Sequence, residues 1–436
     1  MKITNKSKKL ISFFNKFNCI PHSKQTKATD SIFKHFFNEM NEAMNFVSYT
    51  KKQIGHQAFY NLKLTKIDHI NQIPRPTTFN SNTFPQPVRK HIDDFSLSSL
   101  TYSLTLFERK IIIHFIIEED NPEMYINKYN SYVDHILVWL YIINDYASRS
   151  CSKTLTIFIY HTSLTKKLPH SPVEVLNENN VNTAFTRTCL KNAEIVVYRK
   201  EEWFKVLMHE SFHNFALDFS DMDTSDCHSR ILSIFPVSSK VNLFEAYTEF
   251  WARIMNVIFC SYFNCKNKND LNEFLSNTEY FINFEINYSF FQLIKVLDFM
   301  NIEYRNLYEK TDVSANLRST LYKEDTNVLS YYVITTILIY NYQSFLYWCK
   351  TNNTSLLQFK KTSANQKSFC DFIEKKYRIP KILEMIDCSE TFFKKINNTK
   401  NKLDNKPKNK NIKPNERMDE LEFLTNNLRM TICEMG

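Results

Sequence analysis

The chain has 436 residues, of which 43% are hydrophobic and 23% charged, a composition typical of a folded globular protein with room for two compact units. Only two of the residues are glycine, which excludes Gly-rich phosphate-binding loops and dinucleotide-binding fingerprints. The formal net charge of +9 suggests nucleic-acid binding, but much of the excess lies in residues 2–27 and 400–413, which we expect to be solvated basic tails.

The glycine and cysteine contents lead to two expectations. Turns that need a positive φ angle should use Asn or Asp, because glycine is nearly absent. The ten cysteines include no C-x-x-C pair, so we expect reduced thiols in an intracellular, cytoplasmic protein. No secretory signal is recognisable. The uncharged segment 326–349 carries Asn and Gln side chains that favour a buried helix over a transmembrane span.

The first 90 residues begin with a basic segment, continue with an amphipathic stretch at 32–47 and end in a Pro/Asn-rich connector at 73–87. The chain then alternates between strand and helix patterns. Strands are predicted where β-branched and apolar residues cluster, at residues 97–107, 110–118, 154–160, 181–188 and 194–198. Helical periodicity predicts helices at residues 122–147, 201–217 and 243–259, with a loop at 218–239.

Helical patterns continue almost without a break to residue 395. An Asn/Lys/Pro-rich linker that cannot bury a core follows at 396–416, and a last amphipathic helix is predicted at 417–433. The expected fold is α+β: a lobe with a small twisted sheet and a backing helix, followed by a mostly helical lobe. The predicted units are residues 1–90, 91–260, 261–395 and 396–436.

The segment from His209 to His213 reads His-Glu-Ser-Phe-His and has the form H-E-x-x-H. On a helix, positions i and i+4 share a face, so both imidazoles can reach one metal ion. Zinc accepts imidazole and carboxylate ligands, and Glu210 is placed to act as general base for a water that zinc activates. Apolar residues surround the motif, which predicts a buried helix whose histidines need a compensating partner.

The helix predicted at residues 243–259 carries Glu245 and Glu249 on one face. H-E-x-x-H followed by a helical E-x-x-x-D/E resembles the gluzincin family of zinc metallopeptidases. The resemblance implies a zincin-like catalytic lobe in which Glu245 is the third zinc ligand. It also implies that Glu249 orients a ligand histidine, at a position where the thermolysin-like branch usually has Asp. A ligand imidazole needs such a partner for its second nitrogen.

The segment Asn182-Thr-Ala-Phe185 precedes the motif helix and is similar to the Asn-Ala-Phe segment on the edge strand of thermolysin-like enzymes, with Thr183 inserted. The resemblance implies that Asn182, Ala184 and Phe185 bind the backbone of an extended peptide substrate. The run at residues 199–206 also resembles proteins of large DNA viruses, which implies a virion-associated protein as an alternative setting.

Four further residues complete the candidate site. Asp218 lies one position before the third ligand of the metzincin class, so we interpret it as a helix-end residue or one that supports a ligand histidine. A metallopeptidase also needs a donor for the oxyanion that develops during hydrolysis. The candidates for that donor are Tyr331 and Tyr332 on a predicted helix and His228 in the predicted loop.

These observations predict a zinc metallopeptidase that hydrolyses peptide bonds in a peptide or protein substrate. Two other interpretations stay open. The chain could be a zincin fold that binds Zn²⁺ without catalysis and serves as a structural or virion-associated protein. It could also be a basic nucleic-acid-binding protein in which H-E-x-x-H is incidental. Zinc content and salt-dependent affinity for nucleic acid separate these cases.

Overall fold

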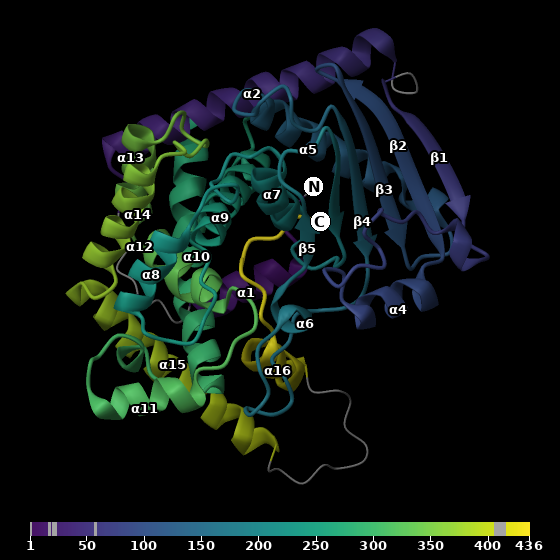
Figure 1. Cartoon of the computed structure of the whole chain (residues 1–436). Coiled ribbons are helices and arrows are strands. Elements are labelled where there is room, and N and C mark those ends of the chain that lie inside the picture. Colours follow the sequence, from purple (N-terminus) through teal and green to yellow (C-terminus); the bar gives the residue numbers. More distant parts are fainter. Residues whose placement is uncertain (1, 16–18, 20–23, 56–58, 405–415) are drawn as a thin grey trace.

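The computed structural model describes residues 2–15, 19, 24–55, 59–404 and 416–436. It consists of a six-stranded sheet with helices on both faces and of a second lobe made of helices alone (Figure 1). The expected α+β class is therefore confirmed. Among the described helices, none combines the length and the apolarity that crossing a membrane requires.

The sheet has the strand order β1-β2-β3-β4-β6-β5. Its strands are β1 (Asn61–Lys66), β2 (Ser98–Leu106), β3 (Arg109–Ile117), β4 (Thr154–His161), β5 (Ala184–Thr186) and β6 (Asn192–Val197). Strands β1, β2 and β3 are antiparallel, β3, β4 and β6 run parallel, and β5 is antiparallel to β6. The strand predicted at 181–188 is shorter in the structure, where only β5 is extended. The helical turn α6 (Glu178–Val181), capped by Asn177, occupies the residues before it. β5 forms one edge of the sheet.

Positive φ angles fall mainly on residues that are neither glycine nor Asn. The turn between β2 and β3 has φ values of 49° at Phe107 and 63° at Glu108, the backbone form that tight hairpins favour. Of the seven described non-glycine residues with positive φ, only Asn301 is an Asn and none is an Asp, so the expectation for these turns is wrong. Each such residue costs about 1–2 kcal/mol, which tertiary contacts must offset.

The two faces of the sheet are covered differently. One face packs against α5 (Ile126–Asn144) and α7 (Trp203–Asn214), which form part of the main hydrophobic core. The other face packs against α4 (Gln86–Phe95) and the connector before it, where Phe84 is fully buried. The Pro/Asn-rich connector therefore packs against this face of the sheet and helps to bury it.

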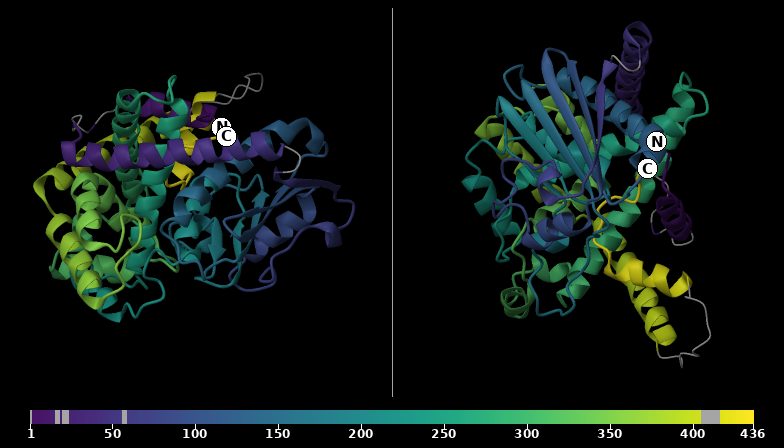
Figure 2. Two further views of the ribbon diagram at one scale, coloured as in Figure 1. Left: turned by 90° about the horizontal axis from the view of Figure 1, so that it is seen from above. Right: turned by 90° about the vertical axis from the view of Figure 1, so that its right-hand side faces the viewer.

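The helical lobe is built around α9 (Leu243–Asn264) and α10 (Leu271–Phe299). The long helix α2 (Lys27–Ile54) packs on α5 in the sheet lobe and on α9 and α10 in the helical lobe, and so joins the two (Figures 1 and 2). Further helices are α8 (Ser225–Ile234), α11 (Asp312–Leu321), α12 (Thr335–Tyr340), α13 (Tyr342–Asn352), α14 (Ser363–Lys376), α15 (Pro380–Asp404) and α16 (Glu416–Asn426). Helix α8 occupies the predicted loop, and α15 runs past the predicted start of the linker.

Both ends of the chain pack against the fold, where they lie side by side (Figure 2). The amide of Gly436 donates to Lys2 O at 2.9 Å, and the amide of Lys2 donates to Gly436 O at 3.2 Å. Helix α1 (Asn5–Asn15) buries Phe14, and the C-terminal segment, residues 427–436, buries Arg429 completely. The expectation of a solvated basic tail at residues 2–27 is therefore wrong for α1, and residues 405–413 of the second expected tail lie outside the described residues.

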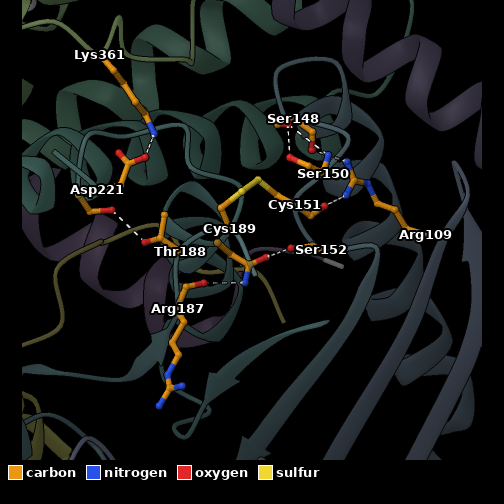
Figure 3. The surroundings of a disulfide bond; sticks show 12 residues. Arg109, Ser148, Ser150, Cys151, Ser152, Arg187, Thr188, Cys189, Asp221 and Lys361 are labelled. Atoms are coloured by element: carbon orange, nitrogen blue, oxygen red, sulfur yellow. Dashed lines mark hydrogen bonds and ion pairs between the residues drawn. A yellow bond between two sulfur atoms is a disulfide. The ribbon is translucent and has the colours of Figure 1, made fainter. Parts of the chain in front are cut away.

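Two disulfide bonds correct the expectation that all cysteines are reduced. Cys19 is bonded to Cys388, and Cys151 to Cys189. The second bond ties the loop before β4 to the turn between β5 and β6 (Figure 3). Beside it, Asn214 at the end of α7 accepts a hydrogen bond from Ser152 Oγ at 2.6 Å. This cluster fixes the end of the motif helix relative to the sheet edge.

Candidate metal centre

Helix α7 carries the H-E-x-x-H motif and lies between the sheet and α9 (Figure 1). Every residue of this helix is buried except His213, which is partly buried, so the predicted burial is confirmed. The helix ends where Ala216 adopts a left-handed φ of 54°. Leu217 N then donates to Phe212 O and Ala216 N to His213 O, the paired bonds of a Schellman motif. The chain reverses direction at this motif, and the side chain of Asp218 therefore lies next to that of His213.

Three acceptor atoms converge at the centre of the site. His209 Nε2 lies 3.1 Å from Glu245 Oε2, His213 Nε2 lies 3.2 Å from His209 Nε2, and His213 Nε2 lies 3.4 Å from Glu245 Oε2. Three ligands of a tetrahedral zinc ion, each 2.0–2.1 Å from the metal, are separated by about 3.3 Å. The triangle therefore has the size that a zinc ion requires, and the three groups form a cluster that could hold a metal ion.

A carboxylate holds the other nitrogen of each imidazole. His209 Nδ1 lies 3.0 Å from Glu249 Oε2, and His213 Nδ1 lies 2.6 Å from Asp218 Oδ2. When Nδ1 carries the proton and donates to a carboxylate, the lone pair of Nε2 points at the centre, which is the tautomer that a metal ligand needs. The structure thus brings Glu249 and Asp218 to the positions expected for ligand-supporting residues.

The charges around the three atoms favour a cation between them. Burial opposes protonation of His209, but the hydrogen bonds that its ring nitrogens donate to Glu245 and Glu249 outweigh this effect and raise its pKa. Burial also opposes protonation of His213, whose pKa is raised well above the ordinary value by Asp218 and Glu245. Burial would raise the pKa of Glu245, but the two imidazoles hold it well below the ordinary range. A metal ion would replace the shared protons as the positive charge.

Lys205 supports the site from one helical turn before His209. Its Nζ donates to Glu249 Oε1 at 2.8 Å and to Oε2 at 3.0 Å, in a pair whose side chains are 3% and 1% exposed. Burial would raise the pKa of Glu249, but Lys205 and His209 lower it to about 2. Glu249 is therefore an anion at every physiological pH.

Glu210 faces a small pocket of about 30 Å³, which has room for about two water molecules. The pocket is lined by the sheet edge, by α7 and by the helical lobe, at residues that include Asn182, Ala184, His209, Glu210, Tyr331 and Met430. Burial raises the pKa of Glu210, and the neighbouring imidazoles only partly offset that effect. A carboxylate with a raised pKa that faces a pocket with room for water is suited to general-base chemistry.

The remaining predicted residues divide between the pocket and other places. Asn182 and Ala184 line the pocket, whereas Phe185 lies on the opposite face of the sheet, with its ring 5.3 Å from that of Phe84. Tyr331 Oη donates to Glu245 Oε2 at 2.8 Å. The structure does not bring the other two oxyanion candidates to the cluster. Tyr332 Oη donates to Leu428 O at 2.7 Å, and His228 Nδ1 lies 3.3 Å from Val241 O.

Sequence reasoning missed Lys205, Glu202 and Met430. Lys205 could have been found, because a lone cation on an apolar helix, four residues before His209, needs a buried anion. Glu202 precedes α7 with a φ of 59°, and its Oε1 accepts hydrogen bonds from the amides of Met430 and Thr431. No local pattern connects residue 202 with residue 430.

Comparisons of this chain with protein-family models, with curated proteins and with solved structures gave no match. The chemical interpretation of the site therefore rests on the contacts described above.

Proposed function

We propose that this protein is a zinc-dependent metallopeptidase. In this proposal His209, His213 and Glu245 hold the metal ion and Glu210 is the general base. The observation that carries it is the near-equilateral triangle of Nε2, Nε2 and Oε2 atoms, with edges of 3.1, 3.2 and 3.4 Å. The two imidazoles are also held by carboxylates at Nδ1, as zinc-binding histidines are in proteins.

Bound zinc would supply Lewis-acid chemistry, because it lowers the pKa of a coordinated water to about 7 and polarises a carbonyl group. The residues of the chain do the rest. Glu210 accepts the proton of the attacking water and later gives it to the leaving amine. Burial among apolar residues raises the pKa of Glu210, and this improves its strength as a base.

Tyr331 is the proposed donor to the oxyanion. Its hydroxyl lies 2.8 Å from Glu245 Oε2, and its ring centroid lies 5.9 Å from that of His209. It belongs to the π-helical turn η4 (Leu329–Ile334), a backbone form that is rare and often occurs at functional sites. A donor fixed at this point stabilises the negative charge that forms on the carbonyl oxygen.

The edge strand β5 is the proposed binding site for the substrate backbone. Ala184 lies on this strand and lines the pocket beside Glu210, and no strand pairs with the outer edge of β5 in the described sheet. An extended peptide can add to such an edge through main-chain hydrogen bonds. A pocket of about 30 Å³ cannot hold a peptide side chain of any size, so the proposal includes separation of the two lobes on binding.

The test measures zinc content and peptide hydrolysis on matched variants. Wild type should contain close to one zinc per chain and cleave a peptide library. Glu245→Ala should lose the zinc, while Glu210→Gln should keep it and lose hydrolysis by at least about 10²-fold. His228→Ala is the control, because His228 lies outside the cluster and should leave both properties intact.

Each failure has a distinct meaning. A wild-type protein that contains no zinc and takes none up overturns the metal site, and salt-dependent affinity for nucleic acid would then favour the basic nucleic-acid-binding alternative. A protein that binds zinc through Glu245 but shows no Glu210-dependent hydrolysis is a zincin-like structural protein without peptidase activity. Full activity of Glu210→Gln overturns the mechanism even if the metal site stands.

A further inference from the structure

Two loops from different lobes are hydrogen-bonded to each other beside the candidate metal centre. Leu176 in the sheet lobe forms an isolated parallel bridge with Glu324 in the helical lobe. The amide of Asp325 donates to Leu176 O at 2.9 Å. Thr326 Oγ1 donates to Asn182 Oδ1 at 3.0 Å. We call these five residues the end wall, because they join the two lobes just before β5 begins.

The C-terminal segment, yellow in Figure 1, joins the lobes near the same end of β5. Its residue Met430 lines the pocket together with Asn182. Its Leu428 N donates to Lys166 O in the sheet lobe at 3.1 Å. The carbonyl oxygen of Leu428 accepts a hydrogen bond from Tyr332 Oη in the helical lobe at 2.7 Å. A second set of hydrogen bonds therefore connects the lobes behind the end wall.

The opposite end of β5 has no such connection. Thr186 Oγ1 accepts a hydrogen bond from Asn214 Nδ2 at 2.9 Å, and Thr188 Oγ1 lies 3.2 Å from Ser220 Oγ. Both partners belong to α7 or to the turn that follows it. Among the residues that the structure describes, none beyond 222 forms a hydrogen bond or an ion pair with residues 184–190. The lobe separation that the proposed function requires can therefore begin at this end, with the end wall as its pivot.

The proposed reactive centre lies close to the end wall. Ala184 lines the pocket together with Glu210, whose carboxylate is the proposed base. Asn182, which belongs to the end wall, is two positions before Ala184 in the chain. Two residues of extended chain span about 7 Å. A peptide that pairs with β5 and places a bond at Glu210 therefore has room for about one or two residues before it meets the end wall.

We propose that the substrate is the free end of a peptide chain, from which the site releases about one or two residues at a time. The proposal rests on the proposed function, because it needs a centre that hydrolyses peptide bonds. In each step water is added across one bond: the carbonyl carbon gains OH and the amine nitrogen gains H. A chain end fits a cleft that is closed at one end. An internal segment would have to pass through the hydrogen bonds that join the lobes.

The test compares a linear peptide with a cyclic peptide of the same sequence, both offered to the full-length protein loaded with zinc. Mass spectrometry should show that the linear peptide loses about one or two residues at a time while the cyclic peptide stays intact. An isotope label at one end shows which end is shortened, and shortening from either end agrees with the proposal. Equal cleavage of the cyclic peptide, or first cuts inside the linear one, overturns the proposal and leaves the proposed function standing.

A binding measurement separates failure of this proposal from failure of the proposed function. Zinc-loaded Glu210→Gln is expected to keep the metal without hydrolysis, so both peptides stay whole during the measurement. The linear peptide should displace a fluorescent linear peptide, and the cyclic peptide should not. If wild type cleaves neither peptide, the peptidase function fails, but this competition still decides whether the cleft recognises a chain end. Equal competition by the two peptides, or binding of neither, overturns the proposal.

The end wall is tested by Thr326→Val, which removes the hydroxyl that bonds to Asn182 and keeps the branched side chain. Loss of one hydrogen bond should raise binding of the cyclic peptide, and hydrogen exchange at the amide of Asp325, by about fivefold. The control is Thr320→Val, because Thr320 Oγ1 donates to Asn316 O at 2.7 Å within α11 and should leave both quantities unchanged. Unprotected exchange at Asp325 in wild type, or equal values in the two variants, overturns the end wall.

Discussion

Lys205 and Glu249 form a buried ion pair, 2.8 Å between Nζ and Oε1, that links the motif helix α7 to the glutamate helix α9 directly beside His209. The pair has two effects. It keeps Glu249 ionised in a place where burial alone would raise its pKa. It also aligns the two helices that carry the histidines and Glu245, because the same carboxylate contacts Lys205 and His209 Nδ1.

Replacing Lys205 with methionine should therefore damage both stability and metal binding. The variant leaves Glu249 buried without its cation, which costs about 3–5 kcal/mol of unfolding free energy. Zinc affinity should fall about 10–100-fold, because His209 loses its orientation. Urea unfolding and a competition assay with a zinc chelator measure the two effects. Lys205→Arg keeps the positive charge and should retain most of the stability and most of the zinc affinity. Equal losses in the two variants would show that the charge of Lys205 is not what stabilises the site.

Asp218→Asn should weaken zinc binding with little loss of fold. The carboxylate of Asp218 lies 2.6 Å from His213 Nδ1, and the amide cannot offer the same negative charge to the imidazole. We expect zinc affinity to fall by about 10–100-fold. Asp221→Asn is the matched control, because Asp221 forms a partly exposed ion pair with Lys361 that contributes at most about 1 kcal/mol. Equal zinc affinity in the two variants would remove Asp218 from the site.

The adjacent tyrosines give a sharp test of the oxyanion donor. Tyr331→Phe should lower kcat by about 10²–10³-fold with zinc content unchanged, because its hydroxyl is the one at the cluster. Tyr332→Phe removes a hydroxyl that donates to Leu428 O, so it should cost about 1 kcal/mol of stability and leave kcat intact. Steady-state kinetics on both variants measure kcat. A lower kcat in Tyr332→Phe than in Tyr331→Phe would reverse the assignment.

Glu324 predicts a pH dependence of stability. It accepts a hydrogen bond from Leu329 N at 2.9 Å, at the start of the turn that carries Tyr331, and burial raises its pKa from 4.5 to about 7. A raised pKa means that the folded protein holds the proton more tightly than the unfolded chain. The contribution is therefore fully present below pH 4.5 and is lost as the pH rises to about 7.

The size of that loss is about 3 kcal/mol, from the pKa change and about 1.4 kcal/mol per unit. In Glu324→Gln the side chain is neutral at every pH, so this variant should not lose stability in this way as the pH rises. Urea midpoints of the two proteins measured between pH 4.5 and 8 should therefore converge at low pH and separate as the pH rises, with the variant the more stable. Parallel curves would show that Glu324 does not titrate in this range.

The parts of the site that could be predicted from the sequence are those set by local periodicity. Positions i and i+4 on a helix share a face, and this placed His209 with His213, and Glu245 with Glu249. Burial of the motif helix followed from its apolar residues. The contact between the two helices did not follow from spacing and came from the family resemblance; the structure brings these four side chains together.

The parts that were missed or misplaced depend on packing between distant segments. Tyr331 and Tyr332 are neighbours on one π-helical turn and point in different directions, and only the position of α9 decides which faces the metal site. Successive residues of a strand point to opposite faces, so Ala184 and Phe185 cannot both face the cleft. The prediction that Phe185 binds the substrate is therefore wrong, and the alternation already shows why. The helix predicted at 417–433 ends at Asn426, and the burial of the C-terminal segment rests on hydrogen bonds to Glu202 and Glu285, far away in sequence.

The contact between Glu202 and the amides of Met430 and Thr431 also sets an order of events during synthesis. A left-handed residue at the start of α7 is held by backbone groups more than two hundred residues further along the chain. This anchor at the start of α7 is therefore complete only after residues 430 and 431 have been synthesised. Before that point α7 lacks this anchor, and apolar surface that is still exposed in the partly folded chain can be bound by chaperones.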